Sequence, residues 1–507
     1  MPTFTTYDGT ELSYRVYGEG EPLVCLAGGP MRDAAYLGNL GGLAAHRALV
    51  LLDARGTGAS AVPADPGTYR CDRQVGDVEA LRAHLGLERV DLLGHSAAGN
   101  LAVLYAAAHP ERIRSLVLVA SVTRALGAAI TDEEWDRAVR VFADRDWYPE
   151  ARAALDGIGP ETPLPQVYDI AVPFSYGRWD AAARAHAADG ARATRWEAAV
   201  AFHGDGAYDP AATRRAVGAL TAPVLVVGGE YDAGPTPAMA AETAAHFPAG
   251  ERFVQPGAGH YPWIDDPDAF VRAVAAFLDP DVRTVTVDGV RLAYRVAGPE
   301  GAPPLVLVHG RGESSGAWKG ITGDLAADHR VYAVDLRGHG LSDRPGGYGF
   351  DAFRDELGGF IEALGLTGAT VVAHSMGAGA AYLLAQRAPA LVGRLVLEEP
   401  PAFLPLDPPR PVAERPEGLL SFDWGIVAAT DAQLNAPDPA WRAGLPAIGV
   451  PTLILAGGPS SHVPQEQLTG LADAIPGARL VTIEAGHLIH RTRPTEFLAA
   501  LREFGTV

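Results

Sequence analysis

The chain has 507 residues, of which 48% are hydrophobic and 20% charged, with a formal net charge of −20 at pH 7. This length exceeds a single compact core, and the composition is that of an ordinary folded enzyme rather than a disordered or fibrous chain. Because nucleic-acid binding needs a concentrated basic face, we expect no nucleic-acid partner.

The N-terminal residues and the apolar stretches predict a cytoplasmic protein without membrane contact. The start, MPTFTTYDGTELSYRVYG, lacks the basic and apolar regions of a secretion signal. No later stretch approaches the roughly 18 apolar residues of a membrane span. The two cysteines, Cys25 and Cys71, are expected to be free thiols, since Cys25 lies in an apolar run and is typical of a small buried side chain.

The sequence repeats itself once, with Asp8 of the first copy matching Asp288 of the second. The stretch ALVLLDARGTGAS returns as RVYAVDLRGHGLS, and VDLLGHSAAGN returns as ATVVAHSMGAG. Repeats of this length are large enough to build separate cores. We therefore predict two domains, residues 1–280 and 281–507, and we expect the duplicated domains to contact one another.

In the first copy, short apolar runs alternate with helical stretches. We expect strands at 22–28, 48–53, 90–96, 115–121 and 223–229, and helices at 75–86 and 97–113. Apolar runs of this kind are typical of strands buried on both faces, and intervening helices indicate parallel crossovers.

The second copy follows the same pattern, with strands expected at 304–310, 331–335, 370–375, 394–399 and 452–458. The predicted fold class is α/β: two tandem domains, each a mostly parallel, doubly wound sheet covered by helices. A ligand site in such a fold lies beyond the carboxyl ends of the strands.

Two segments interrupt this pattern, about 127–219 in the first copy and about 400–447 in the second. We interpret them as inserted lids over the strand ends. The first is helical and rich in aromatic residues, which predicts a closed, largely apolar pocket for a small or medium organic molecule. The second contains many prolines and is expected to be more open.

The third strand of each copy ends in a serine, Ser96 in GHSAA and Ser375 in AHSMG. Small residues two before and two after the serine suit a sharp strand-to-helix turn, because larger side chains would collide there. Such a turn exposes the hydroxyl at a helix N-terminus, where backbone N–H groups can receive negative charge.

A serine hydroxyl needs a base to become nucleophilic, and the base needs a third group to hold it. In the first copy Asp232 lies just past a strand, and His260 lies past the next one. We therefore predict that Ser96, Asp232 and His260 form a catalytic triad.

Both copies resemble the α/β-hydrolase superfamily, in which serine, acid and histidine follow in this order. Each copy contains, in this order, a D-x-R-G-x-G-x-S loop, the serine of the strand-to-helix turn, which we call the elbow, and a histidine that follows a glycine. The resemblance covers nearly the whole chain outside the two insertions. The stretches AGGP and DARGTGAS also resemble the proline-iminopeptidase branch, although that branch has a bulky residue where this chain has Ala97.

The resemblance implies an oxyanion hole in each copy, built from the N–H after the serine and an N–H of the loop after the first long strand. In the first copy these are Ala97 and Gly29, and in the second Met376 and Arg311. The histidine usual before this loop is His309 in the second copy, whereas the first copy has Ala27.

The second copy lacks an acid at the expected position. His487 matches His260, but Ser460 stands where the first copy has Asp232. A neutral hydroxyl can accept or donate a hydrogen bond, but it cannot stabilise the imidazolium that forms when the serine is deprotonated.

Two interpretations follow for the second copy. In one, the acid has moved to the end of the preceding strand, where Glu398 and Glu399 lie; since side chains alternate along a strand, one of them should face the site, and we favour Glu399. In the other, the glutamates are a solvated strand end, and the second domain is an inactive binding or interaction module.

No cofactor and no metal ion is predicted. His487 and His490 are spaced like metal ligands, but no cysteine or carboxylate cluster accompanies them. Gly310, Gly312 and Gly316 match a dinucleotide-binding pattern only imperfectly. Asp53 and Arg55, with Asp335 and Arg337 in the second copy, are expected to brace loops.

These patterns predict a serine hydrolase that cleaves a carboxylic ester, lactone or amide of a small organic substrate through an acyl-enzyme. A non-hydrolytic cyclase or lyase on the same fold is the alternative, because unrelated functions share folds. The binding module of the second domain is a third hypothesis.

Overall fold

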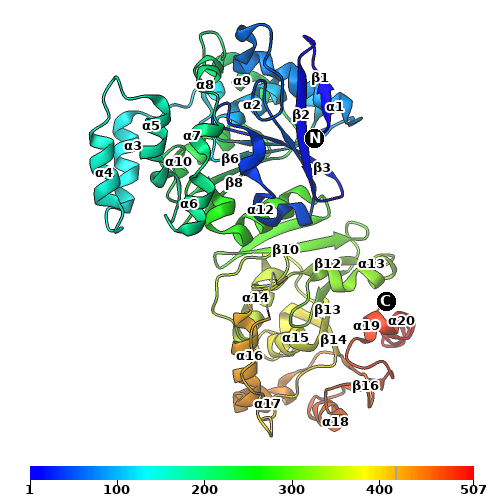
Figure 1. Cartoon of the computed structure of the whole chain (residues 1–507). Helices are drawn as coiled ribbons and strands as arrows, with labels where there is room; N and C mark the ends of the chain where they lie inside the picture. The colour runs from blue at the N-terminus through cyan, green and yellow to red at the C-terminus, as the bar shows by residue number, and fades with distance from the viewer. Residues whose placement is uncertain (417–419, 507) are drawn as a thin grey trace. The chain divides into compact units, whose positions relative to one another are not determined.

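A computed structural model describes residues 1–416 and 420–506, so that 417–419, within the predicted second insertion, lie outside the described residues. The chain forms two compact units, Met1–Leu278 and Asp279–Val507 (Figure 1). Each unit contains one eight-stranded sheet flanked by helices.

The sheet of the first unit has the strand order β1-β2-β4-β3-β5-β6-β7-β8. Its strands are β1 Thr3–Thr5, β2 Glu11–Tyr17, β3 Pro22–Leu26, β4 Ala48–Leu52, β5 Val90–His95, β6 Ile113–Val119, β7 Val224–Gly229 and β8 Gly250–Gln255. Strands β1 and β2 pair antiparallel, and β4 to β8 join β3 in parallel.

The helices that pack around this sheet include α1 Val75–His84, α2 Ala98–Ala108, α10 Pro237–Ala245, α11 Pro262–Asp265 and α12 Pro267–Leu278. The insertion between β6 and β7 contributes α3 Asp132–Val139, α4 Tyr148–Asp156, α5 Leu164–Ala171, α6 Ala181–Ala187, α7 Gly190–Ala193, α8 Trp196–Phe202 and α9 Pro210–Val217. Within this unit, α3, α4 and α5 gather on one side (Figure 1).

The second unit repeats this topology, with the strand order β9-β10-β12-β11-β13-β14-β15-β16. Its strands are β9 Val282–Val287, β10 Val290–Ala297, β11 Pro304–Val308, β12 Arg330–Val334, β13 Ala369–His374, β14 Val392–Glu398, β15 Thr452–Ala456 and β16 Arg479–Thr482. Its helices are α13 Lys319–Leu325, α14 Phe350–Ala363, α15 Ser375–Arg387, α16 Gly425–Asn435, α17 Pro439–Ala443, α18 Gln465–Ala474, α19 Ile489–Thr492 and α20 Pro494–Glu503.

The predicted fold class, two tandem doubly wound α/β domains, is confirmed by this repeated topology. Successive side chains of a strand point to opposite faces of the sheet, and the central strands are apolar on both faces, so helices cover both faces of each sheet. In β11, Val306 and Val308 join a core with α14 and α15, whereas Leu305 and Leu307 join a second core with α13 and α20. Because the central strands of each sheet run parallel, their carboxyl ends lie at one edge of the sheet, and Ser96 and Ser375 lie at that edge.

Both cysteines are buried free thiols, and burial raises the pKa of each. In residues 1–416 and 420–506, no helix is both long and apolar enough to cross a bilayer.

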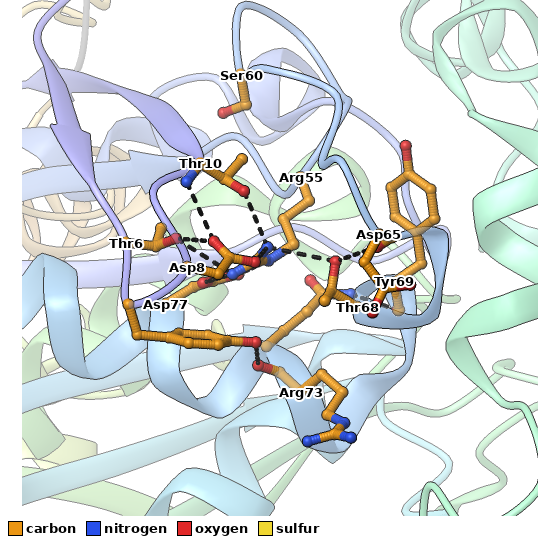
Figure 2. A network of polar contacts seen from close by, with 12 residues as sticks. Thr6, Asp8, Thr10, Arg55, Ser60, Asp65, Thr68, Tyr69, Arg73 and Asp77 are labelled. Carbon is orange, nitrogen blue, oxygen red and sulfur yellow. Dashed lines mark hydrogen bonds and ion pairs between the residues drawn. The ribbon is translucent and has the colours of Figure 1, made fainter.

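Arg55 lies at the centre of a buried polar network in the first unit (Figure 2). Its guanidinium donates to Asp77 and Asp8, and the Nε–Oδ2 distance to Asp77 is 2.6 Å. Hydroxyl oxygens accept its N–H groups at 3.2–3.3 Å from Thr6, Thr10 and Thr68. Because a buried guanidinium is costly without acidic partners, these contacts tie the loop after β4 to α1 and to the β1–β2 turn.

In the second unit, the equivalent arginine, Arg337, is bound by the carboxylate of Glu356. Arg337 donates through Nε to Oε2 of Glu356 at 2.7 Å, and its backbone N–H donates to Oε1 at 2.7 Å. Glu356 lies on α14 as Asp77 lies on α1. The arginine of each D-x-R-G loop is thus bound to the helix that precedes the elbow strand.

The ionised state of Asp8 stabilises the first unit. Burial disfavours the carboxylate, but hydrogen bonds from Arg55, Thr6 and Thr10 outweigh burial and hold the pKa of Asp8 well below its ordinary value. Because the pKa of Asp8 is lower in the folded chain than in the unfolded one, its carboxylate stabilises the fold at pH values above the pKa of the unfolded chain, which is near 4. This contribution is lost as the pH falls from there through the lower pKa of the folded chain.

The substitution Asp8→Asn should therefore lower the free energy of unfolding of the first unit at pH 7 by about 1–2 kcal/mol. Urea unfolding at several pH values measures this, and the deficit should shrink as the pH falls below about 4. Asp288→Asn is the matched control, because among the described residues the guanidinium of Arg337 donates to Glu356 and to the carbonyl of Gly347, and not to Asp288. Equal losses from the two substitutions would contradict the role assigned to Asp8.

Candidate active sites

Each elbow serine has a left-handed backbone, with φ of 53° at Ser96 and 50° at Ser375. Positive φ is uncommon outside glycine, and here the flanking contacts enforce it. A Cβ added to Gly94 would lie 2.9 Å from the carbonyl oxygen of Ala98, and one added to Gly377 would lie 2.4 Å from that of His309. The tight approach of strand and helix therefore requires small residues and turns the hydroxyl outward.

In the first unit, the structure brings the three predicted residues together. The Oγ of Ser96 lies 2.8 Å from Nε2 of His260, and Nδ1 of His260 lies 2.9 Å from Oδ2 of Asp232. Asp232 is buried, and its other oxygen accepts from the N–H of Gly234 at 2.9 Å. The backbone N–H of His260 donates to the carbonyl of Ser175, in the insertion, at 2.7 Å.

In the second unit, the carboxylate comes from the end of β14. The Oγ of Ser375 lies 3.0 Å from Nε2 of His487, and Nδ1 of His487 lies 3.3 Å from Oε2 of Glu399. Glu399 is fully buried and itself has a positive φ of 51°, which follows the last residue of the strand. Burial opposes its ionisation, but hydrogen bonds from His487, Ser461 and Gly457 prevail and lower its pKa.

Glu398 points to a different histidine. Its Oε2 lies 2.7 Å from Nδ1 of His490, and its Oε1 accepts from the backbone N–H of His490 at 3.0 Å. Both side chains are buried, and the ring of His490 packs against Trp318 at a centroid distance of 4.3 Å. The two glutamates thus diverge at the end of β14, where the positive φ of Glu399 directs it toward His487 while Glu398 faces the core.

Ser460, the sequence equivalent of Asp232, is exposed, and its neighbour Ser461 donates to Oε2 of Glu399. No sequence pattern predicts this contact of Ser461. The backbone N–H of Gly457 donates to the other oxygen of Glu399. In the first unit the loop after β7 contains Asp232, whereas in the second unit the equivalent loop after β15 supplies hydrogen-bond donors to Glu399.

The predicted oxyanion loops lie against the elbows. A Cβ on Gly28 would lie 2.8 Å from Cβ of Ser96, and a Cβ on Gly310 would lie 2.6 Å from Nδ1 of His374. Gly29 and Arg311 follow these glycines, while Ala97 and Met376 follow the serines at the start of α2 and α15. In each unit, the two predicted N–H donors thus belong to the two segments that meet at the serine.

The residue before each serine is a buried histidine, and its partners differ between the units. In the first unit Nε2 of His95 faces the carbonyl of His260 at 3.0 Å, and Nδ1 lies 2.7 Å from the hydroxyl of Tyr36. The same hydroxyl accepts from the N–H of Gly28 at 2.7 Å. Because the tyrosine donates to Nδ1, a neutral His95 satisfies both contacts.

In the second unit, Glu313 takes the place of the tyrosine. Its Oε2 lies 3.0 Å from Nδ1 of His374 and accepts from the N–H of Gly310 at 3.1 Å. Nε2 of His374 faces the carbonyl of His487 at 2.9 Å. Carbonyl and carboxylate oxygens only accept, so both ring nitrogens of His374 must donate, which describes an imidazolium.

The pKa directions agree with this assignment. Burial, followed by repulsion from His260, lowers the pKa of His95 well below its ordinary value. Burial also disfavours a charged His374, but attraction to Glu398 and Glu313 outweighs it and raises its pKa. The pKa of Glu313 falls to about 2, because its contacts with His374 outweigh burial. Sequence reasoning missed Tyr36, in the short 3-10 helix Ala34–Leu37, and Glu313, in the loop after β11, since no motif marks either residue.

A cavity of about 600 Å³ lies around Ser375 in the second unit. Its lining includes Met376, Glu399 and His487, together with residues of the 400–447 insertion such as Phe403. In the first unit, a cavity of about 640 Å³ is lined by Tyr36, His186 and Trp263 among others, and Ser96 does not line it.

Aromatic residues of the first insertion pack largely on one another. Trp135, Phe142, Trp147 and Phe174 form T-shaped and tilted ring contacts with centroids 5.3–6.3 Å apart. Phe142 also contacts Tyr231, the residue before Asp232. These rings therefore form a small core beside the acid of the first triad.

Within the described part of the chain, His, Cys, Asp and Glu side chains form no group of three or more that could hold a metal ion. His487 and His490, although close in sequence, bind different glutamates.

Comparisons with known proteins place this geometry in context. The family model of the alpha/beta hydrolase fold matches residues 21–267 and 303–434. An uncharacterized protein of Mycobacterium tuberculosis is 38% identical over 128 residues, which cover 25% of this chain and 37% of that protein. Proline iminopeptidase of Lactobacillus helveticus is 36% identical over 156 residues in the N-terminal part, 29% of this chain and 52% of that enzyme.

The chain thus spans between 37% and 52% of the length of these curated relatives. Among solved structures, an esterase from Exiguobacterium antarcticum is similar at 18% identity and a TM-score of 0.43, covering 54% of this chain and 98% of the esterase. The predicted tandem duplication, with a first copy similar to proline iminopeptidases, is confirmed.

The protonation of His374, which we infer to be charged whereas His95 is neutral, can be measured. Glu313→Gln should lower the pKa of His374, because an amide does not stabilise an imidazolium as a carboxylate does. Two-dimensional ¹H–¹⁵N spectra of the histidine rings at pH 7 should show one doubly protonated ring lost in the variant.

Tyr36→Phe in the first unit is the companion variant, because it removes a neutral partner of His95 and should leave the number of imidazolium rings unchanged. If His374 is already neutral at pH 7 in the parent protein, the assignment is wrong.

Proposed function

Because the chain belongs to the alpha/beta hydrolase fold family, we propose that it is a serine hydrolase that cleaves a carboxylic ester, lactone or amide through an acyl-enzyme. The observation that carries this proposal is the row of serine hydroxyl, imidazole and buried carboxylate, which occurs in both units. We assign a catalytic site to each unit.

In the first unit, Oγ of Ser96 attacks the carbonyl carbon of the substrate while Nε2 of His260 takes its proton. Asp232 stays ionised and stabilises the imidazolium through the contact at Nδ1. The carbonyl oxygen becomes an oxyanion, which the N–H groups of Gly29 and Ala97 stabilise.

When the intermediate collapses, the bond to the leaving oxygen or nitrogen breaks, and His260 returns its proton to that atom. Water then attacks the acyl-enzyme with His260 again as the base, which releases the acid and restores the Ser96 hydroxyl.

In the second unit, Ser375 and His487 have the same roles, and Glu399 is the acid. Three observations support Glu399: its burial, its distance to His487, and the donors from Ser461 and Gly457 that favour its ionised form. The N–H groups of Arg311 and Met376 are assigned to the oxyanion hole.

A small organic molecule is the substrate class that the cavity volume around Ser375 supports. The insertions act as lids in this proposal, since residues of the second one line that cavity and Ser175 of the first binds the backbone of His260.

Labelling with a fluorophosphonate probe, followed by peptide mass spectrometry, tests whether both serines are nucleophilic. We expect phosphonylation of Ser96 and of Ser375, with each lost in the corresponding Ser→Ala variant. Labelling of Ser96 alone would make the second unit a binding module. Labelling of neither would favour the non-hydrolytic alternative.

A matched pair of variants tests the acid of the second unit. In a Ser96→Ala background, Glu399→Gln should slow ester hydrolysis by about 10³- to 10⁴-fold, because an amide cannot stabilise the imidazolium of His487. Glu398→Gln removes the same charge from the adjacent residue but contacts His490, so it should leave most of the activity. Equal effects on initial rates would refute the assignment of Glu399.

A further inference from the structure

The cavity around Ser375 contains two guanidinium groups. Arg311 belongs to the predicted oxyanion loop, and Arg410 belongs to the second insertion. Their side chains are 30% and 36% exposed, so both remain accessible to a molecule that enters the cavity.

Both arginines bind one carboxylate, that of Asp431 on α16. Nη1 of Arg311 lies 2.7 Å from Oδ1 of Asp431, and Nη1 of Arg410 lies 2.8 Å from the same oxygen. Burial opposes ionisation of Asp431, but the hydrogen bonds from Arg410 and Arg311 outweigh it and lower its pKa. Two positive charges therefore face one negative charge.

The other carboxylates of the cavity already have partners. Glu313 binds the imidazolium of His374 and lies 3.6 Å from Arg491, and Glu399 accepts hydrogen bonds from His487, Ser461 and Gly457. His462 contacts the ring of His487, and burial lowers its pKa, which favours its neutral form.

The geometry also leaves donors for an incoming anion. A guanidinium has five N–H groups, and the contacts of each arginine side chain within the described residues use Nη1 alone. As far as residues 1–416 and 420–506 are concerned, Nη2 and Nε of both remain for a carboxylate, which arginine binds in a bidentate manner. Apolar side chains such as Phe350, Phe403 and Leu434 line the same cavity and suit a short carbon chain.

We propose that Arg311 and Arg410 form an anion-binding subsite, and that the second unit acts on esters or lactones that carry a carboxylate. This inference rests on the proposed hydrolase function of Ser375. The first unit has Gly29 at the position of Arg311, so it has no guanidinium at that position, and the two units select different substrates.

Paired substrates test the subsite in a Ser96→Ala chain, where only Ser375 remains. 4-Nitrophenyl hemiglutarate carries a terminal carboxylate, and 4-nitrophenyl valerate has the same chain length without it. The kcat/KM for the hemiglutarate should exceed that for valerate on the order of tenfold or more. Arg410→Gln should lower this ratio by a similar factor, and Arg410→Lys by less.

Arg387→Gln is the control, because it removes one positive charge from an exposed position on α15 outside the cavity. The hemiglutarate-to-valerate ratio should not change in this variant. The same loss in both variants would indicate a general charge effect and would overturn the subsite, as would equal kcat/KM values in the parent. Fluorophosphonate labelling of Ser375 in Arg410→Gln checks that the site still folds.

A binding measurement separates this inference from the hydrolase proposal. Calorimetric titration of the Ser96→Ala/Ser375→Ala chain with glutarate should show binding that weakens in Arg410→Gln, and the neutral glutaramide should bind less tightly. If Ser375 proves unreactive but glutarate binding depends on Arg410, the subsite stands and hydrolysis fails. If Ser375 is reactive but glutarate does not bind, the subsite is wrong.

Discussion

The proposed chemistry of both units depends on one arrangement: an imidazole that faces a serine hydroxyl with one nitrogen and a buried carboxylate with the other. The parallel central strands of each sheet end at a common edge, so residues far apart in sequence meet there. The positive φ of Ser96 and Ser375 turns each hydroxyl toward its histidine. The remaining contacts of the two sites keep these three groups in a row.

The two units meet this requirement by different routes. The acid follows β7 in the first unit and β14 in the second, and in the latter the β15 loop supplies Ser461 and Gly457 as donors instead. A carboxylate can be moved between adjacent strand ends because parallel neighbours deliver their last residues to nearly the same place. What must be conserved physically is the position of an anion at Nδ1, rather than the strand that carries it.

The residues around the serine, histidine and carboxylate also differ in charge between the two units. The first unit places a neutral tyrosine beneath its elbow, whereas the second places Glu313 beside a charged His374 and two arginines above Asp431. Charged groups in a partly closed cavity interact more strongly than in water, so they select among substrates more sharply. Duplication has therefore given one architecture two electrostatic environments.

The sequence by itself determined the duplication, the α/β class, five of the eight strands of each sheet and the approximate place of each serine and histidine, because these depend on local periodicity and on turns that only small residues allow. It placed Glu398 and Glu399 at the end of the preceding strand as candidates for the second acid, indicated through strand alternation that one of them faces the site, and favoured Glu399. Only the tertiary structure decided that Glu399 faces His487 and Glu398 faces His490, and that Tyr36 and Glu313 support the elbows. These contacts join loops distant in sequence, and no local pattern records which side chain fills a space formed by several elements.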